Sequence, residues 1–122
     1  MLRLLAALGR RLGRDESGMV TVEAAYAMAA IAAFLLLGVG AVAGASAQIR
    51  CTDAAREVAR LTAAGDSTAR RVGTAVAPRG AEIEVRGDGD EVVVQVSSGV
   101  PLLPLVTVSA TAVAAREPEA VG

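Results

Sequence analysis

The chain begins with a short basic segment, which is followed by a long apolar run. Residues 19–49 are apolar except for Glu23 and a few hydroxyl and amide side chains. The run is longer than the apolar core of a secretory signal, which has about 7–15 residues. It also exceeds the ~20 residues that an α-helix needs to cross a bilayer. The pattern predicts a transmembrane helix over residues 19–49.

We expect this helix to continue beyond the membrane. No helix breaker occurs before Gly65, and the small and apolar residues after the run recur at helical spacing on one face. A single helix from Met19 to Ala64 is therefore predicted. Gly65 suits the residue that follows a helix C-terminus, and Asp66 or Ser67 can cap a second short helix.

After the second helix the periodicity changes to that of strands. Residues 81–86 and 91–96 alternate between apolar and polar side chains on either side of a Gly/Asp turn, which predicts a hairpin. A third alternating run covers residues 106–115, and the prolines of residues 100–105 argue against a regular strand there. Because three strands with one apolar face need a cover, we expect the helix to pack on the sheet.

The predicted fold class is α+β. A long N-terminal transmembrane and amphipathic helix and a short second helix precede a three-stranded antiparallel sheet that packs on the long helix. The predicted segments are a leader (1–18), a transmembrane helix (19–49), a helix extension with the second helix (50–79), an antiparallel β head (80–116) and a flexible tail (117–122).

Charge gives an orientation but no nucleic-acid signal. The net charge of the 122 residues is −1, and Tyr26 and Phe34 are the only aromatic residues, so no stacking platform for nucleic acid is expected. The leader carries four arginines against two acidic residues. Its positive charge predicts a cell-membrane protein with a cytoplasmic N-terminus and an external head.

The residue types argue against an enzyme or a metal site. Histidine is absent and Cys51 is the one cysteine, which excludes His/Cys zinc sites and an intramolecular disulfide. The acidic turn at residues 88–91 lacks the twelve-residue ligand pattern of a calcium loop. We expect no cofactor, metal or small-molecule substrate. Cys51 is either a small apolar residue on a helix face or a thiol for an inter-chain disulfide.

Two features of the apolar run suggest assembly with other chains. Gly40 and Gly44 form a G-x-x-x-G pattern, which allows close packing of transmembrane helices. Glu23 would cost about 2.5–3.5 kcal/mol near the membrane centre. If the chain were cut after Gly18, the new α-amine of Met19 could pair with Glu23 of a neighbouring copy and set its axial position. The alternative is a protonated or snorkelling glutamate at the cytoplasmic interface.

The segment from Gly18 to Glu23, "GMVTVE", resembles a prepilin peptidase site. The remainder resembles the TadE-like minor pilins of actinobacteria, in "SGMVTVEAA" (17–25), in "QIRCTDAAREVAR" (48–60), in the hairpin and in "VSATAVAAREP" (108–118). The resemblance covers most of the chain after residue 18.

This resemblance implies a structural subunit for assembly of a tight-adherence (Flp) pilus, a type IVb-like filament used in cell adhesion. It implies cleavage between Gly18 and Met19 by a prepilin peptidase. Other pilin subunits and the pilus assembly machinery would be the partners, and the protein would be incorporated into an extracellular pilus. The competing hypothesis is an uncleaved, single-pass, membrane-anchored binding or sensor domain.

Overall fold

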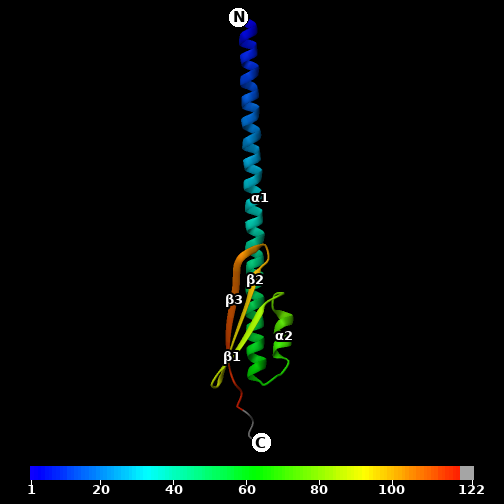
Figure 1. Ribbon diagram of the computed structural model, residues 1–122, viewed down its shortest axis with the longest axis vertical. Coiled ribbons are helices and arrows are strands. Elements are labelled where there is room, and N and C mark those ends of the chain that lie inside the picture. Colours follow the sequence, from blue (N-terminus) through cyan, green and yellow to red (C-terminus); the bar gives the residue numbers. More distant parts are fainter. Residues whose placement is uncertain (119–122) are drawn as a thin grey trace. The chain divides into compact units, whose positions relative to one another are not determined.

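The computed structural model describes residues 1–118, and for residues 8–16 it describes the backbone alone. The chain forms two compact units, Met1–Gly38 and Val39–Gly122. The first unit holds the N-terminal part of helix α1 (Leu2–Ala63), and the second holds the rest of α1 and every other described element (Figure 1). Residues 119–122 of the predicted tail lie outside the described residues.

Helix α1 begins earlier than the sequence pattern predicted. It starts at Leu2, whereas we expected the helix to begin at Met19. Leucine, alanine and arginine make up much of residues 1–18, and all three are strong helix formers. Because this segment contains no proline, nothing in it prevents the helix from extending towards the N-terminus.

The C-terminal end of α1 is set by the glycine that the sequence analysis identified. Gly65 has a φ of 74°, a value that favours glycine, and its N–H donates to the Thr62 carbonyl over 3.0 Å. The Asp66 N–H donates to the Leu61 carbonyl over 2.9 Å. These two bonds form a Schellman motif, which satisfies carbonyl groups that the helix leaves without partners.

Helix α2 (Ala69–Val76) lies where the second helix was predicted. It packs between α1 and the first strand of the sheet, and the approach is close at Gly73. A Cβ at Gly73 would clash with a methyl group of Val58 on α1 and would lie 3.2 Å from Cδ1 of Ile83. Arg50 of α1 reaches the other end of α2, where its Nε donates to the Val76 carbonyl over 3.2 Å.

Strands β1 (Glu82–Asp88), β2 (Glu91–Val100) and β3 (Leu103–Ala115) form an antiparallel sheet in the order β1-β2-β3. The predicted Gly/Asp turn joins β1 to β2, and its Gly89 has a φ of 61°. A positive φ in the first central residue is typical of two-residue hairpin turns.

The link between β2 and β3 differs from the prediction. We expected residues 100–105 to be irregular because of their prolines, but β2 continues to Val100 and β3 begins at Leu103. Pro104 is tolerated because β3 is an edge strand, where a residue without an N–H need not break a ladder hydrogen bond. Leu102 in the turn has a φ of 68°, which costs a leucine about 1–2 kcal/mol.

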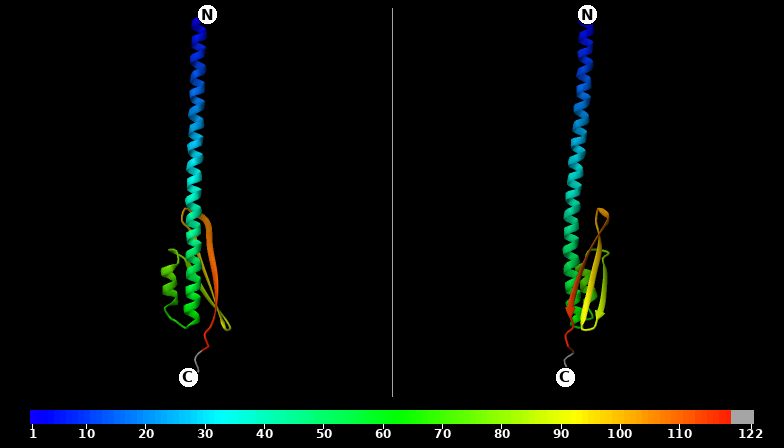
Figure 2. Two further views of the ribbon diagram at one scale, coloured as in Figure 1. Left: turned by 180° about the vertical axis from the view of Figure 1, so that it is seen from behind. Right: turned by 90° about the vertical axis from the view of Figure 1, so that its left-hand side faces the viewer.

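The core lies between the sheet and both helices, which cover the same face of the sheet (Figure 2). Its centre is formed by Val92, Val94 and Val96 of β2, which are buried side by side along the middle strand. The facing side of α1 is made of small residues at helical spacing: Ala47, Cys51, Ala54, Ala55, Val58, Ala59 and Ala63. The predicted α+β fold class, with the sheet packed on the long helix, is confirmed.

The close contact at Gly73 generates a stability prediction. Gly73→Ala should destabilise the head by about 1–3 kcal/mol, the usual cost of overpacking, although alanine favours a helix. Chemical denaturation of the full chain in detergent, followed by circular dichroism, measures the change. Gly99→Ala is the matched control, because a Cβ at Gly99 would meet no atom within 4 Å. If both variants unfold at the same denaturant concentration, α2 does not pack on Val58 as described.

Candidate functional site

The residues of the predicted processing site lie exposed on α1. Gly18, Met19 and Glu23 are all exposed, and a Cβ at Gly18 would meet no atom within 4 Å. The Gly18–Met19 bond is an internal peptide bond of this helix, so the uncut chain has no α-amine at Met19 to pair with Glu23. Cleavage after Gly18 and the registry role of Glu23 stay predictions.

Within the chain, Gly40 and Gly44 contact the β2–β3 hairpin, and their packing against a transmembrane helix of another chain stays a prediction. Gly40 is buried, and its Cβ position lies 3.4 Å from Cδ1 of Leu103, at the start of β3. The Cβ position of Gly44 lies 3.9 Å from Cγ1 of Val100, at the end of β2. The glycines therefore let the β2–β3 turn approach α1 closely. Glycine has no side chain, which favours close association of transmembrane helices. Here the same property allows the hairpin to contact α1.

The end of the β2–β3 hairpin is the feature that sequence analysis missed. Residues 100–105 read Val-Pro-Leu-Leu-Pro-Leu, and we call them the hairpin tip. Leu102 is 72% exposed and Leu105 is 98% exposed, although Leu103 packs on Gly40. The available signal was the charge pattern, since no charged residue occurs between Gln95 and Arg116.

Two polar side chains of α1 hold the rest of the head in place. Gln48 Nε2 donates to the Ser109 carbonyl of β3 over 2.9 Å, which ties the middle of the edge strand to the helix. Arg50 donates to the C-terminal carbonyls of α2, at 3.2 Å for Val76 and 3.5 Å for Ala77. A cation at this end also interacts favourably with the helix dipole. Both residues have structural roles in the head.

Cys51 belongs to the core. Its side chain is fully buried against the sheet, between the small residues of α1. A thiol in that position cannot reach a second chain while the head is folded. The geometry therefore favours the small apolar role for Cys51 over the inter-chain disulfide that the sequence left open.

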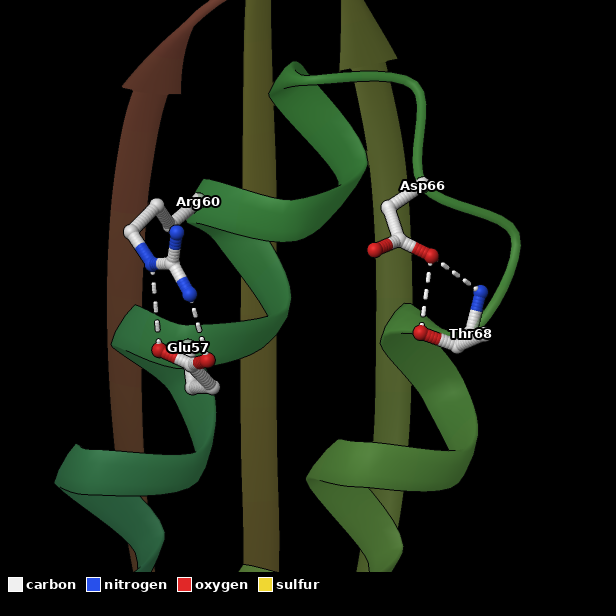
Figure 3. Close-up of polar contacts among 4 residues, drawn as sticks. All are labelled: Glu57, Arg60, Asp66 and Thr68. Atoms are coloured by element: carbon white, nitrogen blue, oxygen red, sulfur yellow. Dashed lines mark hydrogen bonds and ion pairs between the residues drawn. The ribbon is translucent and has the colours of Figure 1, made fainter.

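Charged side chains near the C-terminal end of α1 form contacts with residues close by in the sequence (Figure 3). Arg60 and Glu57, three residues apart on α1, form an ion pair with an N···O distance of 2.7 Å. Asp66 accepts hydrogen bonds from the Thr68 hydroxyl at 2.7 Å and the Thr68 N–H at 2.8 Å. These bonds lower the pKa of the Asp66 carboxyl, so their contribution is present above its ordinary pKa and is lost as the pH falls.

The described surface of the head contains several grooves. One groove of about 530 Å³ lies between α1 and the hairpin, and Arg50 and Arg79 are the charged residues in its lining. Within the described residues, no group of three or more His, Cys, Asp or Glu side chains could hold a metal ion.

The long helix also fits a membrane. Ser17–Ala63 is long and apolar enough to cross a bilayer, with a mean hydropathy of 2.2 in its most apolar window. Only 6% of that window is buried within the chain, whereas a core helix of a soluble domain is mostly buried. By its length and composition, the predicted transmembrane helix could span a membrane.

Comparison with known proteins changes the functional interpretation. No protein-family model matches the chain, and no solved structure matches it. The "Apoptosis inhibitor Rv3655c" of Mycobacterium tuberculosis is 43% identical over 98 residues, which cover 80% of this chain and 78% of that protein. The predicted function in pilus assembly and cell adhesion is therefore wrong, because this relative is named for a different activity. The chain belongs to the family of this mycobacterial apoptosis inhibitor.

Proposed function

We propose that the chain is a single-pass membrane protein that inhibits apoptosis through non-covalent binding by its α+β head. The observation that carries this proposal is the 43% identity to the apoptosis inhibitor over 80% of the chain. At that coverage the matched region must include most of the head as well as helical sequence. The resemblance to TadE-like proteins stays a prediction, and it carries no part of this proposal.

The surface of the head supports binding in preference to catalysis. The apolar face of the sheet is covered by α1 and α2, so the opposite face is the one that a partner can reach. On β1 that face carries Glu82, Glu84 and Arg86, all exposed. Arg86 and Glu84 form an exposed ion pair at 2.7 Å, which is worth little to stability and is free to exchange partners. These residues are candidates for contact with a protein partner.

The proposed orientation places the head outside the cytoplasm. Four arginines, Arg3, Arg10, Arg11 and Arg14, precede the apolar run. Positive residues next to a transmembrane helix are retained on the cytoplasmic side.

The inhibitory activity can be tested with the full chain in cultured animal cells. Cells that produce it and are then treated with an inducer of apoptosis should show lower effector-caspase activity than cells with an empty vector. Val58→Asp should abolish the protection, because an uncompensated charge at this fully buried position costs about 3–5 kcal/mol.

The matched control for this test is Ser67→Asp, which introduces the same side chain at an exposed position before α2. It should protect as well as the parent chain does. Unchanged caspase activity in cells that contain the folded parent chain would refute the proposed inhibition. Equal protection by Val58→Asp would show that the head is not the active part.

The orientation can be tested with a thiol reagent that does not cross membranes. Ser67→Cys places a cysteine on the exposed surface of the head, whereas the native Cys51 is fully buried. Intact bacterial cells that produce the Ser67→Cys chain should be labelled, and cells that produce the parent chain should not. Labelling that occurs only after lysis would place the head in the cytoplasm and reverse the proposed topology.

A further inference from the structure

The hairpin tip is apolar, and charge is confined to the opposite end of the same hairpin. Leu102 and Leu105 are exposed at the tip, and β3 carries no charged residue. At the other end, the Arg116 N–H donates to the Asp90 carbonyl and the Glu117 N–H donates to the Ala63 carbonyl at the end of α1. The hairpin thus runs along α1 from a charged end to an uncharged one (Figure 1).

The contact between Leu103 and Gly40 fixes the level of the tip along α1. Residues 24–49 contain no charged side chain, and Glu23 and Arg50 bound this segment. A membrane-spanning helix needs about 20 residues, and every stretch of that length within residues 24–49 contains Gly40. Wherever the bilayer sits on this segment, the level of Gly40 lies inside the hydrocarbon. The tip is packed on the helix at that level.

Two prolines reduce the number of backbone N–H groups that the tip would leave unpaired in hydrocarbon, although residues 104–106 have no partner on β2. Hydrocarbon offers no water to satisfy free N–H groups, so irregular backbone is normally excluded from it. Pro101 and Pro104 have no N–H to leave unpaired, and Val100 and Leu103 are paired across the turn. Leu102 occupies a positive-φ position where glycine or asparagine is usual. An exposed leucine is thus present where the backbone geometry disfavours it.

We infer that the hairpin tip inserts into the lipid bilayer beside α1, where acyl chains cover Leu102 and Leu105. The head then has a second attachment to the membrane besides the transmembrane helix. The occupant is lipid, because a surface at the level of Gly40 is surrounded by acyl chains. This inference rests on the proposed membrane anchorage and is independent of the proposed inhibition of apoptosis.

The test uses the full chain in phosphatidylcholine vesicles that contain nitroxide-labelled lipid. An environment-sensitive fluorophore is attached to Leu102→Cys, to Leu36→Cys in the apolar run, or to Ser67→Cys on the head. Cys51 is fully buried and should not react. We expect nitroxides shallow in the acyl chains to quench position 102, deep nitroxides to quench position 36, and no quenching at position 67.

The outcomes separate this inference from the anchorage on which it rests. Quenching at position 36 without quenching at position 102 overturns the inserted tip and leaves the membrane helix in place. A lack of quenching at position 36 overturns both.

A pair of substitutions tests which side chain carries the insertion. Leu105→Asp should abolish quenching at position 102, because a charged side chain opposes entry into hydrocarbon. Val113→Asp is the control, since Val113 is 57% exposed on β3, eight residues from Leu105 and away from the tip. Val113→Asp should leave quenching unchanged. Equal effects of both substitutions would contradict insertion at the tip.

Discussion

The close packing of α1 against the middle strand is the constraint on which the head depends. The buried face of α1 consists almost entirely of alanines around Cys51 and Val58. The facing strand, β2, contributes Val92, Val94 and Val96. Small side chains on one surface and branched ones on the other allow a near approach without voids, which a small core needs. Helix α2 follows the same rule, because Gly73 is the residue that lets it lie against Val58.

This packing also determines where the hairpin ends along the helix. The bond from Glu117 to Ala63 holds one end of β3 near the C-terminus of α1, and the bond from Gln48 to Ser109 holds its middle. A strand rises about 3.3 Å per residue and a helix only 1.5 Å, so β3 covers many helical residues. The 13 residues of β3 therefore extend the sheet along α1 as far as Gly40. Contact with the apolar part of the helix follows from the length of the strand.

Features with a local cause could be predicted from the sequence, and those with a distant cause could not. Gly65 ends α1 as predicted, and the turn around Gly89 forms as predicted, because each depends on the backbone freedom of one glycine. By contrast, Pro104 lies in β3 because that strand is at the edge, which only the sheet order reveals. The partner of Gly40 likewise depends on residues far away in the sequence. The prediction of a pilus function was wrong for a related reason, because a short processing-site pattern and an anchored α+β head are compatible with more than one function.

A second attachment to the membrane would change how the head meets a partner. A domain held by one helix can turn about that helix, and a binding partner must then pay the entropy of fixing its orientation. Lipid around the hairpin tip would restrict this rotation before any partner arrives. The exposed face of the sheet, with Glu82, Glu84 and Arg86 on β1, would then be presented in one direction from the membrane surface. In this arrangement the positive φ of Leu102 would reduce the stability of the isolated head. Lipid contact at the tip would in turn reduce the entropy cost of binding a partner.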